Sequence, residues 1–362
     1  MLDRAPGAPT PAPASTLGVM AAGTTTWARC RYLALMHKAL LLAVALTFAA
    51  GCSSSDDTAG STTSPATTIV APDTMAPDTT APDTTPVVDT SPVVPDPTRP
   101  FDVFVPSSYT KGTAMPLVVL LHGYGATGPI QEAYFGVQAL AESEGFLYVH
   151  PTGTTNSLGA AFWNATDACC GYQTTVDDVA YLTGILDSVS AQYDVDPKRI
   201  YFMGHSNGGF MSYRMACELS GRVAAIASLA GATFLDAAKC NPSEPVSVLQ
   251  VHGTDDGTIA YAGGATEGIG VSYPGAEQSV ATWATYNACA GAIAASGSAL
   301  DLEPTVDGSE SQLTAYAGCP AGVDVQLLTV TGGPHIPSVN FPDGSHPMIV
   351  AMVEFLLAHP KA

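Results

Sequence analysis

Basic residues are scarce in this chain. Among its 362 residues, 12 lysines and arginines stand against 32 aspartates and glutamates, which gives a formal net charge of −20 at pH 7. Nucleic acids and anionic membrane surfaces repel a chain this acidic. Neither is therefore an expected partner.

Short metal-ligand spacings are also missing. The sequence has eight cysteines and eight histidines but contains no Cys-x-x-Cys and no His-x-x-x-His. These are spacings with which cysteine and histidine commonly hold zinc. We therefore expect no metal site.

The apolar segment from Ala39 to Ala50 is shorter than the about 20 residues that a membrane-spanning helix needs. It follows the basic start Met36-His37-Lys38, which is the pattern of an export signal. We expect residues 1–52 to form this signal region, with translation beginning at Met36 or at Met20.

The signal region ends in small residues before a cysteine. Ala49-Ala50-Gly51 precedes Cys52, as in bacterial lipoproteins, although Ala49 occupies a position where leucine is usual. The pattern predicts lipid attachment at Cys52, and with it a protein of the cell envelope or the extracellular space. This anchor is the one membrane association that we expect.

Residues 53–99 consist mainly of threonine, proline, aspartate, alanine and serine. The unit Ala-Pro-Asp-Thr begins at Ala71, at Ala76 and again at Ala81. Such a segment cannot bury enough apolar surface to offset the entropy lost on ordering. We expect a disordered tether that proline and like charges keep extended.

Residues 100–362 are enough for one α/β domain with its own core. Apolar runs alternate with helical patterns, which predicts a mostly parallel sheet covered by helices on both faces. Strands are expected near residues 101–105, 117–122, 146–150, 199–204, 223–229, 246–252 and 325–330. Helices are expected near residues 130–144, 176–192, 207–219, 278–288 and 346–358.

One predicted strand-to-helix turn carries the motif Gly-x-Ser-x-Gly. The apolar run Ile200-Tyr201-Phe202-Met203 leads into Gly204-His205-Ser206-Asn207-Gly208, and a helical pattern follows. This is the sequence form of a nucleophile elbow, in which the two glycines make room for a sharply turned backbone. Ser206 is therefore the predicted nucleophile.

A serine nucleophile needs a base, and the base needs an orienting carboxylate. In α/β-hydrolases the chain order is Ser, Asp, His. Asp256 follows the predicted strand 246–252 and His335 follows the predicted strand 325–330, each on a glycine-containing loop at a carboxyl end. We expect Ser206, Asp256 and His335 to form a triad that needs no cofactor.

Two members of this triad have rivals. Asp255 stands next to Asp256, and either residue suits a turn beside Gly257. His346 is the rival of His335, but it lies where the last helix is expected to begin. Three further histidines flank glycines and are expected to be hydrogen-bonded scaffold groups: His122, His205 and His252.

A serine hydrolase also needs N–H donors for the oxyanion that develops on the substrate. The elbow supplies one donor, the Asn207 N–H. The second donor should follow the first core strand, which here runs into His122-Gly123-Tyr124. We assign it to the Tyr124 N–H, with Gly123 as the alternative.

From about Pro100 onward, the chain carries a set of further motifs: Leu121-His122-Gly123, Phe162-Trp163-Asn164, Cys169-Cys170-Gly171, Val176-Asp177-Asp178-Val179, Gly204 to Gly209, His252 to Asp256, Tyr261-Ala262-Gly263-Gly264 and Gly332-Gly333-Pro334-His335. In these motifs it resembles the secreted esterase family that contains polyhydroxybutyrate depolymerases, feruloyl esterases and acetylxylan esterases. The resemblance implies an α/β-hydrolase fold and ester hydrolysis by Ser206, Asp256 and His335.

Substrate recognition is the least defined part of the resemblance. It implies that Trp163 lies near the acyl- or sugar-binding cleft, and that the loops around Trp163, Tyr261 and Ile336 set specificity. The family usually has Gly-Gly-Gly-His-Thr-Trp-Pro-Gly, whereas here Pro334 replaces the third glycine and Ile336-Pro337-Ser338 follows the histidine. Asp177 and Asp178 begin a predicted helix, where we expect them to cap it.

The predicted catalytic domain holds six cysteines: Cys169, Cys170, Cys217, Cys240, Cys289 and Cys319. An even number in an exported domain predicts disulfides, for which 15 pairings exist. The family resemblance favours Cys217 with Cys240 and Cys289 with Cys319, which leaves Cys169 and Cys170 as a neighbouring pair.

These observations predict a secreted, lipid-anchored serine esterase that acts through an acyl-enzyme on a polymeric or small ester. The acyl group is left open between hydroxybutyrate, feruloyl, acetyl and other polyesters. One alternative is a prolyl-oligopeptidase-type peptidase. The argument against it is that we expect no propeller domain before the catalytic part. Another alternative is a catalytically silent envelope protein that binds polysaccharide or polyester. The presence of all three triad residues argues against it.

Overall fold

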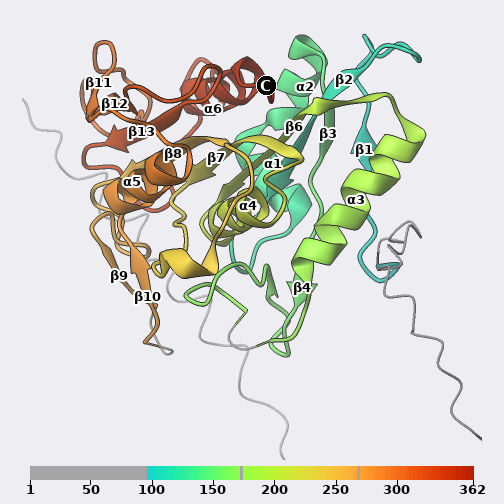
Figure 1. Ribbon diagram of the computed structural model, residues 1–362, viewed down its shortest axis with the longest axis horizontal. Helices are drawn as coiled ribbons and strands as arrows, with labels where there is room; N and C mark the ends of the chain where they lie inside the picture. Colours follow the sequence, from blue (N-terminus) through green and yellow to red (C-terminus); the bar gives the residue numbers. More distant parts are fainter. Residues whose placement is uncertain (1–95, 172–173, 267–269) are drawn as a thin grey trace, which may run out of the picture. The chain divides into compact units, whose positions relative to one another are not determined.

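The computed structural model of the protein describes residues 96–171, 174–266 and 270–362. The predicted signal region, Cys52 and most of the predicted tether lie outside the described residues. All described residues belong to one compact unit, Thr85–Ala362. At its centre lies a nine-stranded sheet with the order β1-β3-β2-β6-β7-β8-β13-β12-β11 (Figure 1).

The central sheet is parallel except at its edges. β3, β2, β6, β7, β8 and β13 pair in parallel, whereas β1, β12 and β11 pair antiparallel. The mostly parallel α/β sheet predicted from the sequence is confirmed. Its strands are β1 (Val103–Phe104), β2 (Met115–Leu121), β3 (Leu147–Val149), β6 (Val195–His205), β7 (Val223–Leu229), β8 (Ser247–Gly253), β11 (Ile293–Ala295), β12 (Ser311–Tyr316) and β13 (Val325–Val330). Two small hairpins lie outside it, β4 (Thr154–Thr155) with β5 (Ala161–Phe162) and β9 (Gly263–Ala265) with β10 (Ser272–Pro274).

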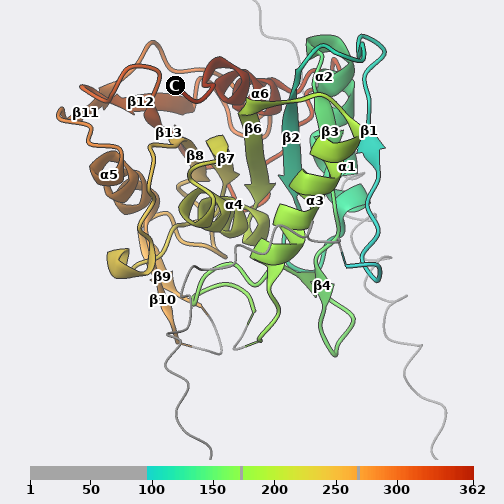
Figure 2. The ribbon, with the colours of Figure 1, turned by 45° about the vertical axis from the view of Figure 1, so that its right-hand side comes forward.

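Helices cover both faces of the sheet (Figure 1 and Figure 2). Side chains of α3, α4 and α5 pack into the core on one face, and side chains of α1, α2 and α6 pack into the core on the other. Among the described residues, no helix is both long and apolar enough to cross a bilayer. The helices are α1 (Gly128–Phe135), α2 (Val137–Glu144), α3 (Asp178–Gln192), α4 (Asn207–Glu218), α5 (Ala276–Tyr286) and α6 (Pro347–Ala358), with a short 3-10 turn η1 (Ala237–Lys239).

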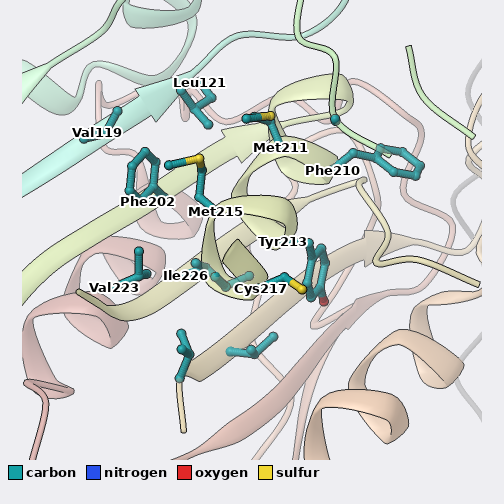
Figure 3. Close-up of a cluster of buried hydrophobic side chains, with 14 of the residues drawn as sticks. Val119, Leu121, Phe202, Phe210, Met211, Tyr213, Met215, Cys217, Val223 and Ile226 are labelled. Carbon is teal, nitrogen blue, oxygen red and sulfur yellow. The ribbon is translucent and has the colours of Figure 1, made fainter. Parts of the chain in front are cut away.

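Alternate side chains of the central strands enter opposite layers of the core. Val119 and Leu121 pack with Phe202 and with Met215 of α4 (Figure 3), while Leu120 packs on the other face. A strand buried on both faces has a continuous apolar sequence. This pattern is why the central strands are predictable from the sequence.

The described fold differs from the prediction in the helix at 130–144, in the edge strands β11 and β12, and in the two small hairpins, for which no strands were expected. The helix expected over residues 130–144 is interrupted at Gly136, which has a left-handed φ of 68° and separates α1 from α2. Glycine adopts this conformation at little cost, and a residue in it ends a helix. The edge strands β11 and β12 were not predicted, because half-buried residues such as Thr314 form no apolar run.

All three predicted disulfides are present. They join Cys217 to Cys240, Cys289 to Cys319 and the neighbours Cys169 and Cys170.

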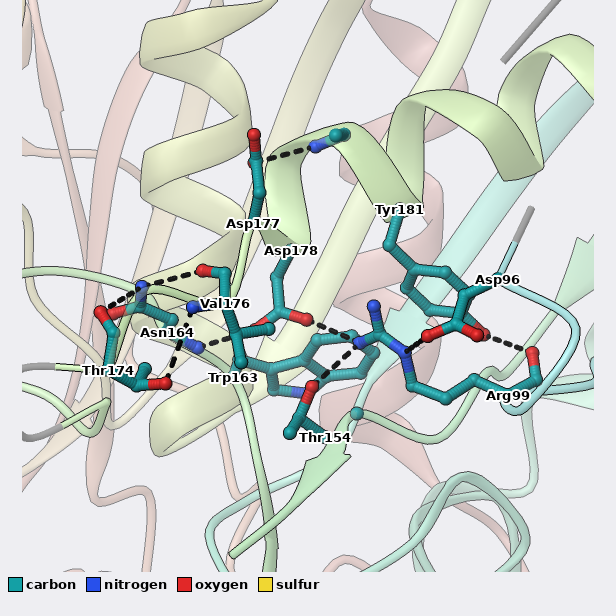
Figure 4. A network of polar contacts seen from close by, with 12 residues as sticks. Asp96, Arg99, Thr154, Trp163, Asn164, Thr174, Val176, Asp177, Asp178 and Tyr181 are labelled. Carbon is teal, nitrogen blue, oxygen red and sulfur yellow. Dashed lines mark hydrogen bonds and ion pairs between the residues drawn. The ribbon is translucent and has the colours of Figure 1, made fainter. Parts of the chain in front are cut away.

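Arg99, the last residue assigned to the tether, is instead part of the folded domain. Its guanidinium lies 3.7 Å from the centroid of the Tyr181 ring and forms an ion pair with Asp178 (Figure 4). The Asp178 side chain has no exposed surface, and it also accepts a hydrogen bond of 2.7 Å from the Asn164 N–H. Asp177 caps α3 as predicted, by accepting from the Ala180 N–H, whereas Asp178 forms a buried ion pair in place of a cap.

We expect Arg99→Ala to destabilise the domain strongly. The substitution leaves the Asp178 carboxylate buried and unpaired, and breaking a buried ion pair in this way costs about 3–5 kcal/mol. Urea unfolding measures the loss. The matched control is Arg222→Ala, which removes a more exposed ion pair with Asp187 and should cost about 1 kcal/mol or less. Equal losses in the two variants would contradict the assigned role of burial.

Candidate active site

Three side chains that lie far apart in the sequence meet at one rim of the sheet. Ser206 lies between β6 and α4, Asp256 follows β8 and His335 follows β13. The Nε2 atom of His335 is 2.9 Å from the Ser206 Oγ, and its Nδ1 atom is 2.7 Å from the Asp256 Oδ2. The predicted convergence of these residues is thus observed. The alternatives Asp255 and His346 form no part of it: Asp255 is exposed, and His346 is the N-cap residue of α6.

The backbone at Ser206 has the conformation expected of a nucleophile elbow. Its φ is 54°, a value that residues with a Cβ rarely adopt, and its N–H donates to the Leu229 carbonyl at 2.8 Å. A Cβ on Gly204 would lie 2.4 Å from the Gly208 backbone, and one on Gly208 would lie 2.0 Å from the Leu121 carbonyl oxygen. The two glycines of the motif are therefore required by close packing.

Asp256 is held in its charged form. Its side chain is completely buried, and its Oδ1 accepts from the N–H groups of Thr258 and Ile259, both at 2.8 Å. Burial raises the pKa of Asp256, but hydrogen bonds from His252 and His335 outweigh it and hold that pKa well below its usual value. The carboxylate is therefore ionised at neutral pH and can orient the His335 ring.

His252 supports Asp256 at Oδ2, the same carboxylate oxygen that His335 contacts. Its Nδ1 lies 3.0 Å from the Gln250 Nε2, which can only donate. The proton of the neutral ring is therefore on Nε2, which lies 2.8 Å from the Ile259 carbonyl oxygen and 3.2 Å from the Asp256 Oδ2. This agrees with the predicted scaffold role.

His122 and His205 are scaffold groups as well. His205 lies with its Nε2 2.8 Å from the His335 carbonyl oxygen, and the His122 Nε2 accepts from the Gly153 N–H at 2.9 Å. Burial lowers the pKa of His122 to about 4, and burial together with repulsion from His335 lowers the pKa of His205 to about 4. Both rings are therefore neutral near pH 7.

We expect these two histidines to make stability depend on pH. In the unfolded chain a histidine has a pKa of about 6.5, so between pH 6.5 and 4 the unfolded state binds more protons than the folded state. The free energy of unfolding therefore falls as the pH is lowered through this window, by up to about 3 kcal/mol for each group. Urea unfolding at pH 7, 5.5 and 4.5 measures the slope. His122→Gln should reduce it, and a flat profile would contradict the expectation.

Helix α1 carries a residue that the sequence analysis missed and that fixes the loop after β2. Gln131 of α1 is 2% exposed, and its Oε1 accepts from the Gly123 N–H at 3.1 Å. This contact holds in place the segment that contains Tyr124. It also occupies the N–H of Gly123, the alternative oxyanion donor. The sequence carried no signal for this role, because only the structure shows that Gln131 is buried and faces Gly123.

Asn207 is fixed at the other side of the serine. It is the first residue of α4, where backbone N–H groups have no acceptor within the helix. Its side chain accepts from the Trp163 N–H at 2.7 Å and donates to the Trp163 carbonyl at 2.9 Å.

Trp163 does not form a substrate wall. The side chain has no exposed surface, its indole N–H donates to the His122 carbonyl at 3.1 Å, and its ring stacks on Tyr181. Because the ring is completely buried, it offers no surface to a substrate, and the assignment of Trp163 as a substrate-binding residue is not supported. Trp163 instead connects the loop after β2 to Asn207.

A pocket of about 420 Å³ opens beside Ser206. Three large apolar side chains at this pocket are unusually exposed, namely Ile336 (64%), Ile130 (58%) and Tyr124 (42%). The predicted role of the Ile336 loop at the site is consistent with this position, whereas Ile130 was missed. The residues that line the pocket are Gly123, Tyr124, Ala126, Ile130, Gln131, Tyr134, His205, Ser206, Thr258, His335 and Ile336.

Tyr261, the other predicted substrate residue, does not line this pocket. Its hydroxyl lies 2.9 Å from the Thr329 hydroxyl and donates to Glu277 at 3.4 Å, in a separate hollow. Tyr261 therefore lies outside the serine pocket, and its role in substrate binding stays a prediction. The described residues contain no group of three or more histidines, cysteines or acids placed to hold a metal ion.

The mostly parallel sheet and the strand-to-helix turn at Ser206 define an α/β-hydrolase. The solved structure of an acetyl xylan esterase from Aspergillus awamori has the same fold, with a TM-score of 0.50 and 14% identity over 71% of this chain and 93% of that one. Residues 94–303 match the family model for esterases. The chain belongs to this esterase family.

Curated relatives of the chain carry esterase names. Feruloyl esterase B of Piromyces equi is 30% identical over 64% of this chain, and feruloyl esterase D of Neurospora crassa is 28% identical over 69%. A bifunctional acetylxylan esterase/xylanase of Neocallimastix patriciarum is 30% identical over 45%. The matches cover 41%, 78% and 22% of these relatives, so the chain spans less than half of the first and third.

Proposed function

We propose that this protein is a serine esterase. Ser206 Oγ attacks the ester carbonyl while His335 Nε2 takes its proton, and Asp256 stabilises the imidazolium that forms. His335 then gives the proton to the departing alcohol. Water attacks the acyl-enzyme by the same route and releases the acid. The contact of His335 with both Ser206 and Asp256 carries the proposal.

The oxyanion is assigned to the N–H groups of Asn207 and Tyr124, which flank the serine. The side chain of Asn207 and the contact of Gln131 with Gly123 support this assignment, because each fixes one of the two donor segments. Gln131 acts through the backbone and is a positioning residue.

We expect Gln131→Leu to lower kcat about tenfold and to leave KM nearly unchanged, because a displaced donor loses contact with the transition state more than with the substrate. Gln131→Glu keeps the acceptor for the Gly123 N–H and should restore most of the activity. A loss of kcat in Gln131→Leu that Gln131→Glu does not restore would contradict this role. Thermal unfolding of both variants controls for lost stability.

The lining of the serine pocket favours an acyl group larger than acetyl. Ile130, Tyr134 and Ile336 line the pocket with apolar groups, and an aromatic or butyryl-sized acyl group would bury more of this surface than acetyl would. The names of the curated relatives, feruloyl esterase above all, support an aromatic acyl group. We therefore propose feruloyl-type esters as the preferred substrates.

Product release from methyl ferulate, acetylated xylan and polyhydroxybutyrate film tests this preference. We expect the highest kcat/KM on methyl ferulate, and hydrolysis of p-nitrophenyl butyrate above that of p-nitrophenyl acetate. A preference for acetyl esters would contradict the acyl assignment. Inactivity on all of these esters would contradict the esterase.

We further propose that residues 1–52 direct export, that Cys52 carries a lipid and that residues 53–99 tether the domain. The three disulfides support an oxidising compartment, because such bonds persist outside the cytosol. In a bacterial host, the wild type should partition with membranes and Cys52→Ala should not. Equal partitioning of the two would contradict the anchor.

A further inference from the structure

A second groove lies between α5 and the antiparallel edge of the sheet. It consists of two hollows of about 480 Å³ and about 330 Å³, which share Tyr261, Glu277 and Gln278. We propose that this groove binds a neutral oligosaccharide. The inference goes beyond the proposed esterase, which involves only the pocket beside Ser206.

The fold leaves this groove open. Helix α5 packs over β8 and β13 (Figure 1), while Thr314 and Tyr316 on the neighbouring strand β12 are only half-buried and line the larger hollow. The Cys289–Cys319 disulfide joins the chain just after α5 to the chain just after β12. Both walls are therefore covalently connected. A groove that is already formed loses little conformational entropy when it binds a ligand.

Polar groups are concentrated at the centre of the groove. The Tyr261 hydroxyl lies 2.9 Å from the Thr329 hydroxyl and donates to the Glu277 carboxylate at 3.4 Å. Burial and the nearby Glu277 charge raise the pKa of Tyr316. Its hydroxyl therefore keeps its proton and can donate. The carboxylate of Glu277 and the amide of Gln278 add an acceptor and a second donor.

Apolar surface lies beside these groups. Ile293, Leu327 and Ala281 line the larger hollow together with the two tyrosines. A sugar ring has one face of C–H bonds and an edge of hydroxyls, so aromatic and aliphatic surface next to hydroxyls, a carboxylate and an amide matches both.

The charges of the groove exclude other ligand classes. Its lining includes no lysine, arginine or histidine among the described residues, so it offers no partner for a phosphate or a carboxylate. One glutamate is too few for a metal ion. The net charge of −20 also disfavours anionic polymers. A neutral saccharide carries none of these penalties.

A buried histidine lies between the groove and the triad. The ring of Tyr261 lies 5.7 Å from the ring of His252, whose Nε2 is 3.2 Å from the Asp256 carboxylate. A polysaccharide seated in the groove would hold ester groups near Ser206 and raise their local concentration. This consequence rests on the proposed function, whereas the binding itself does not.

Calorimetric titration with xylohexaose and with cellohexaose tests the binding. Neither sugar carries an ester, so the result does not depend on the serine pocket. We expect the wild type to bind at least one of them, Tyr316→Ala to bind at least tenfold more weakly, and Tyr316→Phe to lie between the two. The matched control is Tyr286→Phe, whose hydroxyl contacts the Ala237 carbonyl outside the groove lining. It should bind like the wild type.

The inference is overturned if the wild type binds neither sugar at millimolar concentration, or if Tyr316→Ala binds as tightly as the wild type while its thermal unfolding is unchanged. Kinetics separates this inference from the proposed esterase. Tyr316→Ala should lose activity on feruloylated xylan and keep it on p-nitrophenyl butyrate. A wild type that binds sugar but hydrolyses no ester would refute the esterase alone, and an active wild type that binds no sugar would refute the groove alone.

Discussion

Ser206→Ala is expected to lower kcat on p-nitrophenyl butyrate on the order of 10⁵-fold, which corresponds to about 7 kcal/mol of transition-state stabilisation. The variant lacks the Ser206 Oγ, which is the atom that bonds to the acyl group in the acyl-enzyme. Residual activity should come from the oxyanion donors and from substrate binding. Stopped-flow and steady-state assays measure the loss.

The Ser206→Ala variant should fold normally. Alanine keeps the Cβ, so the backbone at φ 54° meets the same constraints as in the wild type. The control is the melting temperature, together with a phosphonate inhibitor that should label the wild type at Ser206 and should not label the variant. Undiminished turnover in Ser206→Ala would eliminate the serine mechanism.

His335→Ala should be nearly as inactive as Ser206→Ala, because a serine without its base is a poor nucleophile. Residues that act as a unit are not additive. The kcat of the double variant Ser206→Ala/His335→Ala should therefore lie within about threefold of the kcat of each single variant.

His346→Ala is the matched control for the base. His346 is the N-cap residue of α6, and its ring lies 3.4 Å from the position that a Cβ on Gly136 would occupy. It has no contact with the triad among the described residues, so the variant should keep kcat within about twofold. If His346→Ala loses activity and His335→Ala keeps it, the base is misassigned.

The triad could be predicted because each of its members has a local signal. Gly204 and Gly208 on either side of Ser206 predict the turn, and the loops of Asp256 and His335 each follow an apolar strand. Parallel strands bring their carboxyl ends to one edge, so chain order alone was enough to expect these residues to meet. The Cys217–Cys240 and Cys289–Cys319 pairings came from the family resemblance.

The substrate contacts could not be predicted in the same way. Trp163 and Tyr261 were assigned from motifs, but a motif does not reveal which way a side chain points or how deeply it is buried. Trp163 is buried beneath the loop after β2, and Tyr261 faces a different groove. Ile130 lines the serine pocket, although no motif in the sequence marks it.

By itself, the sequence determined the acidic character of the protein, the order of the triad residues along the chain, the turn that carries the nucleophile and the cysteines available for pairing. Local patterns settle these features, because glycine requirements and apolar periodicity act over a few residues. Only the tertiary structure decided that Arg99 belongs to the domain, that His252 supports Asp256 and that α5 and β12 enclose a groove. Each of these depends on residues brought together from distant parts of the chain, and packing in three dimensions fixes their distances.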